Sequence, residues 1–577
     1  MRIALAQINH HIGDFENNVA RIKSAIKKAR VLQADVVVFA ELSVCGYPPR
    51  DFLEFDDFIR KSEAAVKSVA EVCHGIAAII GAPSVNQASK GKPLHNTVYF
   101  LAKGTVQTFS HKTLLPNYDV FDEYRYFEPN RLPYHAAEFK KYRFALTICE
   151  DLWNITDDPL YVRNPMDELA ILNPDVIINI AASPFHYDQD RQRKEVLTRT
   201  AKKYGLPVFY VNHVGGQTEL LFDGGSMVIA PDGTLFDQLN YFEEDLRVYN
   251  LNDFLYKLTV PGSQIPVPSS QSAGEKNESP NESIQYPASG IRHPASSQKI
   301  SLIHDALIMG ITDYFSKMGF KKAILGLSGG IDSAVTLVLA AKALGSDNVK
   351  AILLPSQFSS DHSINDAVEL AENLNVSYDI IRIEEAFLVL NQTLKPWFKD
   401  LAFNLTEENM QARIRAVILM ALSNKFGYIL LNTSNKSEAA VGYGTLYGDM
   451  CGGISVLGDV YKTQVYELSK WINNKKEIIP VQIIEKPPSA ELRPGQLDSD
   501  SLPDYQTLDE LLFEYIEQQK GPAELVSAGF DENLVMKVLK LVNTSEYKRY
   551  QTPPILRVSP KAFGTGRRMP IVAKYLA

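Results

Sequence analysis

Two short stretches of this sequence carry residues whose types and spacing could do chemistry. The first reads AILGLSGGIDSAVTLVLAA over residues 323–341, where an apolar run is followed by a glycine turn and an amphipathic run. A strand that ends in such a turn before a helix presents backbone N–H groups and the positive end of a helix dipole to an anion. The Gly-Lys-Ser/Thr of a Walker loop is absent. We therefore expect a phosphate-binding loop of a different kind.

The second stretch, FALTICEDLW, places Cys149 at the end of an apolar run and before an expected turn. Most lone cysteines are buried structural residues, and the neighbouring Glu150 and Asp151 would raise the pKa of an uncompensated thiol. A reactive Cys149 therefore needs a cation and a base nearby. Glu41, directly after the run DVVVFA, and Lys112, in SHKTLLPNYDVFDE, are candidates. Taken singly, each would more ordinarily be a solvated side chain.

The motifs FAEL, HKTLLPNY and CEDLW, in that order, resemble the nitrilase/amidase superfamily. The resemblance covers roughly residues 1–250 and implies an αββα sandwich with a Cys-Glu-Lys active site. It implies that Cys149 attacks an amide carbon, while Glu41 takes the thiol proton and later activates water. Lys112 would stabilise the oxyanion, helped by a backbone N–H group.

In members of that superfamily that are joined to a synthetase, the amide is that of glutamine. The resemblance assigns Tyr118, in the lysine loop, and Ser183, in AASPFHYDQDRQRK, to glutamine binding. A basic residue is expected shortly after, but Gln189 stands there, with Arg191 and Arg193 just beyond. Gln189 is therefore the candidate, and it stays open which basic residue, if any, binds the glutamine carboxylate.

The SGGxDS pattern resembles the pyrophosphate loop of N-type ATP pyrophosphatases, which cut ATP between its α- and β-phosphates. Five fixed positions would arise by chance in a chain this long about once in a thousand. The resemblance implies that the loop binds the β,γ-pyrophosphate, and that Asp332 binds Mg²⁺, which supplies the charge of the missing lysine. The residues expected at ATP are Gly326, Leu327, Ser328, Gly329, Gly330, Ile331, Asp332, Ser333, Thr433 and Lys462.

Later motifs narrow the substrate to one group of these enzymes. In order, they resemble glutamine-dependent NAD synthetases over nearly the whole of 298–577, and they are EENMQARIRAV (407–417), ILLNTSNKSEAAVGYGTLYGDMCGG (429–453), LGDVYKTQVYEL (457–468) and KPPSAELRPGQLDSDSLPDYQTLDELL (486–512). The resemblance implies that the carboxylate of deamido-NAD⁺ is adenylated by ATP. Ammonia from glutamine then opens the adenylate, and AMP, pyrophosphate and glutamate are released.

By the same resemblance, deamido-NAD⁺ contacts Asn409, Arg413, Glu438 and Lys548. Glu438 is equally a candidate to join Asp332 at the metal. Asn409 and Arg413 are one helical turn apart, and without the resemblance a solvated helix face would be the more ordinary interpretation. The resemblance also implies a homodimer or a larger homo-oligomer.

The elements that must position these residues fall into two halves. A segment rich in Pro, Ser, Gly and Asn leads us to predict a nitrilase-like domain at 1–258, a linker at 259–297 and a synthetase domain at 298–577. Short β-branched runs and helical patterns alternate in the first half, as expected for layered sheets covered by helices. The second half predicts an α/β fold with an open, mostly parallel sheet, from helix 301–318, strand 323–327, helix 332–344, strand 349–353, helix 363–374 and strand 378–383.

Composition bounds the class of protein. The chain has 577 residues, of which 45% are apolar and 22% charged, and this is ordinary for a soluble globular protein of more than one domain. Its net charge of −9 argues against a nucleic-acid partner. There is no apolar run of about 20 residues for a membrane span, no signal-peptide pattern and no CxxC spacing among the four cysteines. We therefore expect a cytoplasmic enzyme with small-molecule substrates and no membrane partner.

Three other functions fit parts of the sequence. An enzyme that makes another amide, such as a GMP-synthetase-like product, normally carries a Cys-His-Glu glutaminase, and no Cys-His pattern is found here. A nitrilase with a nucleotide-sensing second half, or a structural protein, would have no need of Asp332, Thr433 and Lys462 together.

Overall fold

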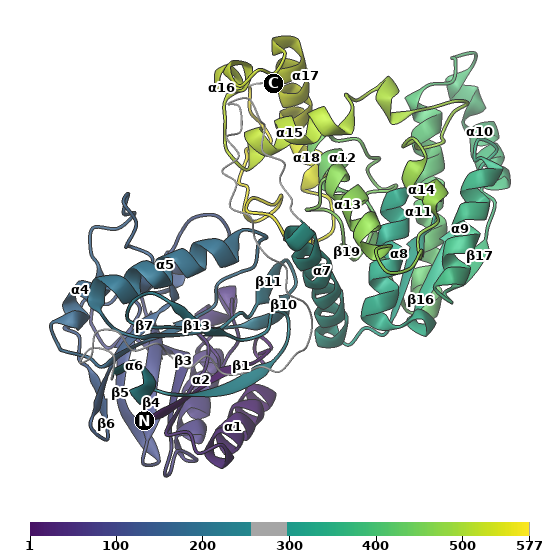
Figure 1. Cartoon of the computed structure of the whole chain (residues 1–577). Coiled ribbons are helices and arrows are strands. Elements are labelled where there is room, and N and C mark those ends of the chain that lie inside the picture. The colour runs from purple at the N-terminus through teal and green to yellow at the C-terminus, as the bar shows by residue number, and fades with distance from the viewer. Residues whose placement is uncertain (256–296, 576–577) are drawn as a thin grey trace, which may run out of the picture.

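The structure is a computed structural model that describes residues 1–255 and 297–575. Figure 1 shows two lobes side by side, an N-terminal lobe in purple to teal and a C-terminal lobe in green to yellow. The predicted domain boundary at 258 and residues 259–296 of the predicted linker lie outside the described residues. Within the described ranges, none of the helices combines the length and apolar character that crossing a bilayer requires.

Two six-stranded sheets form the N-terminal lobe, with parallel strands at the centre and antiparallel strands at the edges. The first sheet has the order β14-β1-β2-β3-β4-β5, from strands β14 (Asp245–Asn250), β1 (Arg2–Gln7), β2 (Val36–Val38), β3 (Ala77–Val85), β4 (Leu94–Ala102) and β5 (Thr105–His111). The second has the order β13-β12-β9-β8-β7-β6, from β13 (Leu235–Gln238), β12 (Met227–Ile229), β9 (Val208–Asn212), β8 (Val176–Ala181), β7 (Tyr142–Ile148) and β6 (Ala137–Phe139).

The inner faces of the two sheets pack against each other around a common core. Ile3 and Val36 of the first sheet belong to the same buried cluster as Phe144 and Ile178 of the second. Helices α1 (Phe15–Val31) and α2 (Asp56–Ala70) cover the outer face of the first sheet. Helices α4 (Pro165–Ala170) and α5 (Gln189–Tyr204) pack against the second sheet. The predicted αββα sandwich is confirmed.

The parallel centre of each sheet determines where the polar residues gather. Strands buried on both faces carry mostly apolar runs, so most of their polar neighbours follow the end of the strand. Glu41 follows β2, Cys149 follows β7 and Ser183 follows β8. The shorter elements of this lobe are η1 (Arg50–Glu54), α3 (Glu123–Tyr126), η2 (Cys149–Leu152), α6 (Asn252–Leu255) and the hairpin of β10 (Val214–Gln217) and β11 (Leu220–Asp223).

The C-terminal lobe is built on one five-stranded parallel sheet of order β17-β16-β15-β18-β19. Its strands are β15 (Lys322–Gly326), β16 (Val349–Leu353), β17 (Ser377–Ile380), β18 (Tyr428–Asn432) and β19 (Ile454–Ser455). The chain adds β16 and β17 on one side of β15 and then returns to the other side with β18. A ligand site is expected outside the carboxyl ends at such a reversal of strand order.

Alternation along β15 divides the covering helices between two faces. Ala323 and Leu325 belong to a buried cluster with α7 (Ser297–Met318), α8 (Ile331–Leu344), α9 (Asp361–Asn373), α13 (Lys462–Ile472) and α14 (Val481–Glu485). Ile324 points the other way, toward α10 (Glu384–Phe398) and α11 (Leu405–Phe426). The remaining elements are η4 (Ser346–Asn348), α12 (Lys436–Val441), η5 (Asp498–Asp500), α15 (Tyr505–Ile516), α16 (Pro522–Ser527), α17 (Glu532–Thr544) and α18 (Glu546–Arg549).

The predicted α/β class of the second half and its six leading elements are confirmed, each within a few residues. One detail of the first half differs, because Lys112 directly follows β5, an edge strand that we did not predict. The sequence of β5, TVQTFSH, is polar and exposed along most of its length. An edge strand of this kind lacks the buried apolar run that identified the other strands.

The two lobes meet along α7, which packs against the β10–β11 hairpin (Figure 1). Lys317 donates hydrogen bonds to Asn9 Oδ1 and to the Gly216 carbonyl, at 2.7 and 2.8 Å. The C-terminal tail returns to the first lobe, where Arg557 pairs with Asp119 at 2.5 Å. Asp119, the neighbour of Tyr118 in the lysine loop, is therefore held by the other lobe.

Candidate functional site

Glu41 and Lys112 form a buried ion pair at the carboxyl ends of the first sheet. The Lys112 ammonium lies 2.7 Å from Glu41 Oε1, and both residues are at most 1% exposed. The second carboxylate oxygen of Glu41 accepts a hydrogen bond of 3.0 Å from the Ala182 N–H group, which follows β8. Asn96 donates to Glu41 Oε1 at 2.7 Å. These contacts leave the Glu41 side chain in one orientation.

A second carboxylate, that of Glu123, completes this cluster. Its Oε1 atom accepts hydrogen bonds from Lys112 at 2.8 Å and from the Tyr47 hydroxyl at 2.9 Å. Sequence reasoning missed Glu123, although it lies in DVFDEYRYF shortly after the lysine motif. A further carboxylate in that loop was the available signal, but many loops carry one. Glu41 and Glu123 hold the Lys112 ammonium from two sides, at a position that solvent does not reach.

Cys149 begins the short η2 turn with a backbone φ of +42°, a left-handed conformation that is uncommon for a residue with a side chain. Asp151 holds this turn against the lysine loop. Its carboxylate accepts hydrogen bonds from the N–H groups of Ile148, Thr113 and Leu114, at 3.0, 2.9 and 3.0 Å. The η2 turn and the loop after Lys112 are thus joined by one buried side chain, that of Asp151.

The electrostatics of the cluster suit a base and a nucleophile. Burial raises the pKa of Glu41 to about 7, against the opposing effect of the Lys112 charge. Burial and the nearby Glu41 carboxylate raise the pKa of the Cys149 thiol well above its ordinary value, and Lys112 lowers it in part. Burial disfavours the charge of Lys112, but Glu123 and Glu41 outweigh it and raise its pKa. Burial thus favours a neutral Cys149 thiol, and the Glu41 carboxylate is near enough to raise the pKa of that thiol.

The structure brings two of the predicted glutamine residues into contact. The Gln189 side chain, at the start of α5, donates to Ser183 Oγ at 3.0 Å. Tyr118 lies beside the turn that holds Cys149, where its hydroxyl donates to Glu150 Oε1 at 2.9 Å and Tyr161 also donates at 3.0 Å. Glu150 and Tyr161 were not among the predicted residues.

Arg193, one of the two arginines beyond Gln189, is not available to a ligand. It is 1% exposed, and its guanidinium makes a two-point ion pair with Asp223, with one N–O distance of 3.0 Å. Arg191 is exposed on the other side of the helix turn. A basic contact to a substrate carboxylate is therefore not supplied by Arg193.

In the C-terminal lobe a cavity of about 310 Å³ opens at the carboxyl ends of β15, β16 and β18. All predicted ATP residues line it, namely those at 326–333 together with Thr433 and Lys462. Gly329 has a φ of +80°, and a Cβ atom there would lie 2.3 Å from the Ser363 carbonyl oxygen. Only glycine fits this close approach of the loop to the start of α9.

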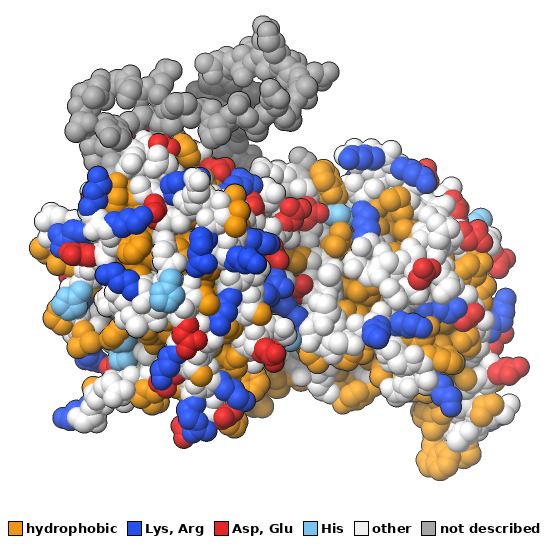
Figure 2. Space-filling model, turned by 90° about the horizontal axis from the view of Figure 1, so that it is seen from below, with side chains coloured by type: hydrophobic (Ala, Val, Ile, Leu, Met, Phe, Trp, Pro, Cys, Tyr) orange, Lys and Arg blue, Asp and Glu red, His pale blue; other side chains and the backbone are white. Residues whose placement is uncertain are grey.

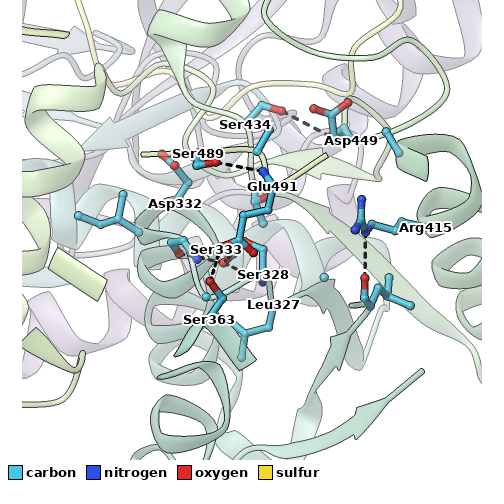
Figure 3. A pocket seen from close by; sticks show the side chains of 18 of the residues that line it. Leu327, Ser328, Asp332, Ser333, Ser363, Arg415, Ser434, Asp449, Ser489 and Glu491 are labelled. Carbon is cyan, nitrogen blue, oxygen red and sulfur yellow. Dashed lines mark hydrogen bonds between the residues drawn. The ribbon is translucent and has the colours of Figure 1, made fainter. Parts of the chain in front are cut away.

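Hydroxyl groups inside the loop hold it in shape. Ser333 donates to the Gly330 carbonyl at 2.9 Å, and Ser328 Oγ accepts from the Gly330 N–H group at 3.2 Å. Figure 3 shows Ser328 and Ser333 beside each other in the cavity. The residues of the first turn of α8 line the cavity, and the N–H groups of a first helical turn have no partner within the helix, as an anion site requires.

Asp332 and Glu438 converge on the ammonium of Lys462. Lys462 Nζ lies 2.5 Å from Asp332 and 3.5 Å from Glu438, and Asn435 donates to the other Asp332 oxygen at 2.8 Å. Burial and the neighbouring Asp332 raise the pKa of Glu438 to about 8, while Lys462 opposes them. Asn435 is thus a direct partner of the loop aspartate.

Asp332 and Glu438 are the candidates to hold Mg²⁺ in this cavity. Among the described residues, no group of three or more His, Cys, Asp or Glu side chains stands close enough to hold a metal by itself. Mg²⁺ in nucleotide sites is ordinarily held by one or two carboxylates, with substrate phosphates and water as the other ligands. Two converging carboxylates beside a phosphate loop match that donor set, so the site fits Mg²⁺.

The other residues predicted at deamido-NAD⁺ lie one layer outside the cavity, around the loop 442–446. Asn409 accepts from Thr445 Oγ1 at 2.6 Å, and Arg413 donates to the Leu446 carbonyl at 3.1 Å. Lys548 donates to the Gly442 and Gly444 carbonyls, both at 2.8 Å. Thr445 itself lines the cavity, so the three side chains hold a segment of its wall.

Several residues that line the cavity were missed by sequence reasoning. Arg415 and Asp449 lie across the cavity from Asp332, and Glu491 and Ser489 lie near the glycine loop (Figure 3). Arg415 donates to the Leu354 carbonyl at 2.9 Å, and burial lowers its pKa to about 10. Their sequence signal was present in the motifs RIRAV, YGDM and KPPSAEL, but no spacing rule indicates which of those residues point inward.

Comparisons with known proteins agree for both lobes. The carbon-nitrogen hydrolase family model matches residues 2–255, and the NAD synthase family model matches residues 303–552. The chain is 40% identical over 580 residues to a glutamine-dependent NAD(+) synthetase of Synechocystis sp., covering 99% of each. It is 39% identical over 586 residues to that of Thermotoga maritima, covering 100% of this chain and 99% of the relative.

A solved structure extends this likeness to three dimensions. The glutamine-dependent NAD+ synthetase of Acinetobacter baumannii, in complex with adenosine diphosphate, aligns with a TM-score of 0.74 at 36% identity. The alignment covers 99% of this chain and 98% of that one. The chain therefore belongs to the glutamine-dependent NAD⁺ synthetase family.

Proposed function

We propose that the chain amidates deamido-NAD⁺ to NAD⁺ with ATP, using ammonia that its N-terminal lobe releases from glutamine. The observation that carries the proposal is the presence in one chain of a buried Glu41–Lys112 pair beside Cys149 and of a cavity on an SGGIDS loop. An amidase that frees ammonia and a synthetase that consumes it form one reaction sequence. We propose that the enzyme works in the cytoplasm.

In the N-terminal lobe, Glu41 takes the proton of the Cys149 thiol as the sulfur attacks the amide carbon of glutamine. The pKa of about 7 for Glu41 suits this exchange at neutral pH. Lys112 stabilises the oxyanion, and ammonia leaves with the proton that Glu41 returns. Glu41 then activates water, which releases glutamate from the sulfur. Glu123 positions Lys112 throughout, since it holds the ammonium from the other side.

We propose that Tyr118, Ser183 and Gln189 recognise glutamine. The Gln189–Ser183 hydrogen bond supports a common role for these two side chains, because it presents an amide and a hydroxyl at the carboxyl end of β8. Both groups can donate to a carboxylate without carrying charge. The burial of Arg193 in its pair with Asp223 supports Gln189 over a basic residue at this position.

In the C-terminal lobe, the carboxylate of deamido-NAD⁺ attacks the α-phosphorus of ATP and pyrophosphate leaves. Ammonia then attacks the acyl carbon of the adenylate, AMP leaves, and a proton is lost to give the amide. The glycine loop at 326–333 and Thr433 bind ATP, and Lys462 offsets the charge of its phosphates. Asp332 and Glu438 would hold Mg²⁺, which supplies further positive charge to the phosphates when bound.

Asn409, Arg413 and Lys548 are proposed to act on deamido-NAD⁺. Their contacts to the loop 442–446 support a role in shaping the wall of its site, and each keeps further donors for the substrate. Glu438 lines the cavity, and we propose that it contacts deamido-NAD⁺ or binds the metal.

The two reactions need ammonia in its unprotonated form. Free ammonia is mostly NH₄⁺ at neutral pH and is then no nucleophile, so we propose that it passes between the lobes without entering solvent. The contacts of Lys317 with Asn9 and of Arg557 with Asp119 support a fixed junction for such a passage. An added ammonia-consuming enzyme should leave glutamine-driven synthesis unchanged, and loss of NAD⁺ formation would exclude a sealed passage.

We propose a homodimer that forms through exposed apolar side chains of α10, of α11 and of the loop between them. We call this surface the apolar α10–α11 face. Trp397 is 73% exposed there, with Leu401, Leu405 and Val417 likewise exposed. Figure 2 shows hydrophobic side chains gathered at the outer end of the C-terminal lobe. Exposed apolar patches of this kind ordinarily mark an interface. Trp397→Glu should convert a dimer to a monomer in light scattering, whereas an unchanged mass would exclude this face.

The function is tested by incubating the full chain with ATP, Mg²⁺, deamido-NAD⁺ and glutamine. NAD⁺, AMP, pyrophosphate and glutamate should appear together, with NAD⁺ equal to AMP and to pyrophosphate. Formation of glutamate without NAD⁺ or AMP would leave the amidase standing and contradict the assignment of the second lobe.

A further inference from the structure

The start of helix α9 touches the glycine loop and lines the same cavity. Ser360 is the N-cap of α9 and accepts a hydrogen bond from the Ser363 N–H group at 3.2 Å. The Ser363 carbonyl is the group that faces the open side of Gly329. Two helix N-termini, those of α8 and α9, therefore meet at the position where the loop binds phosphate.

A carboxylate of the chain itself occupies this meeting point. Glu491 accepts hydrogen bonds from Ser363 Oγ at 2.7 Å and from Ser360 Oγ at 3.0 Å, and it pairs with Lys486 at 3.0 Å. The Ser360 N–H group points at its other oxygen at 3.3 Å. Figure 3 shows the Glu491 side chain reaching toward Ser363 and Ser328. We call the group of Ser360, Ser363 and Lys486 the anion seat.

The anion seat is built for a negative charge. Burial acts to raise the pKa of Glu491, but the hydrogen bonds from Ser363 and Lys486 outweigh it and lower that pKa. Lys486 also donates to Ser363 Oγ, so a cation, two hydroxyls and a helix N-terminus all face one occupant. Such a combination binds phosphate oxygens as well as it binds a carboxylate.

Lys486 is the cation that this seat can offer to ATP. Within the part of the cavity wall that the structure describes, the basic side chains are Arg415, Lys462 and Lys486. Lys462 is bonded to Asp332 and Glu438. Arg415 lies on the other side of the cavity in Figure 3. Lys486, by contrast, bonds to Ser363, the residue against which the glycine loop packs.

We propose that, before ATP binds, the Glu491 carboxylate occupies the position of the terminal phosphates of ATP. When ATP binds, the anion seat of Lys486, Ser360 and Ser363 releases this carboxylate and binds the β,γ-pyrophosphate in its place. This inference rests on the proposed assignment of the cavity to ATP. Because one anion replaces another, the half-buried Lys486 has a negatively charged partner both with and without ATP. Its charge is therefore never left buried and unpaired. After the chemistry, Glu491 competes with pyrophosphate for the seat and favours its release.

The test measures equilibrium binding of ATP, inorganic pyrophosphate and AMP to the full chain by calorimetry, with Mg²⁺ present. Glu491→Gln removes the competing charge and should tighten ATP and pyrophosphate, while Lys486→Met should weaken both by about tenfold or more. AMP has no β- or γ-phosphate, so its affinity should change in neither variant. Lys486→Arg keeps the charge and should restore most of the ATP affinity.

Arg493→Gln is the matched control, since Arg493 lies on the same segment and pairs with Asp500 away from the anion seat. Thermal denaturation of every variant checks that the fold is kept. Weaker ATP binding in Glu491→Gln would show that Glu491 only supports the site and would overturn the inference. Equal changes for AMP and ATP would also overturn it. Failure of the unaltered chain to bind either nucleotide would refute the assignment of the cavity, and this inference with it.

Discussion

The ammonium of Lys112 lies 2.7 Å from the carboxylate of Glu41, and neither side chain contacts solvent. A buried carboxylate without this partner would be far harder to ionise, and an exposed one would be too weak a base for a thiol. The pair holds the pKa of Glu41 at about 7, where the carboxylate is both substantially ionised and basic. The proposed role of Glu41 as a base therefore depends on the contact with Lys112 as much as on its own identity.

Glutamine hydrolysis should lose activity as the pH falls through about 7. The pKa of Glu41 is raised, so the carboxylate takes up a proton below that pH and no longer accepts one from Cys149. Profiles of kcat/KM for glutamine against pH measure this limb. Synthesis driven by added ammonia, compared at a constant concentration of unprotonated NH₃, bypasses Glu41 and should lack this limb. Presence of the same limb in both profiles would assign it to the second lobe.

Cys149→Ala and Asp332→Ala should separate the two lobes. The first variant loses glutamine-driven synthesis and keeps ammonia-driven synthesis, because only the amidase is disabled. The second loses both, since Asp332 lines the cavity proposed to bind ATP. NAD⁺ formation with either nitrogen source is the measurement. Equal loss of both activities in the two variants would contradict this division.

Arg193→Met should destabilise the N-terminal lobe by about 3–5 kcal/mol, because it leaves Asp223 charged, buried and without its partner. Chemical denaturation measures the loss, and a second substitution, Asp223→Leu, should recover part of it. At a temperature where the variant is folded, its KM for glutamine should stay near that of the unaltered chain. Gln189→Ala should raise that KM instead. A raised KM in Arg193→Met with an unchanged KM in Gln189→Ala would assign the glutamine carboxylate to Arg193.

Glu438→Gln should raise the Mg²⁺ concentration needed for half-maximal ammonia-driven synthesis several-fold. The reason is that Glu438 and Asp332 converge on one point of the cavity, and the amide is a weaker Mg²⁺ ligand than the carboxylate. Titration of Mg²⁺ at fixed ATP gives the result. The control Glu385→Gln, exposed on α10, should leave the requirement unchanged. An unchanged requirement in Glu438→Gln would assign Glu438 to deamido-NAD⁺ alone.

The sequence by itself determined the chemistry-bearing residues that lie at strand ends. Cys149, Glu41 and the loop at 326–333 each follow a continuous apolar run, and such a run is a reliable sign of a buried central strand. Parallel strands bring their carboxyl ends to one edge, so the approximate grouping of these residues followed from the order of the runs. The αββα sandwich and the parallel sheet were predictable for the same reason.

Only the tertiary structure decided which loop residues join them. Glu123, Glu150 and Glu491 lie in polar segments without periodicity, where many carboxylates look alike and most are solvated. Their roles follow from contacts with Lys112, Tyr118 and Lys486, to which they are brought by packing between elements that are distant in the sequence. The local sequence pattern predicts burial and secondary structure. The partner of a loop side chain depends instead on which distant segment of the chain packs against that loop.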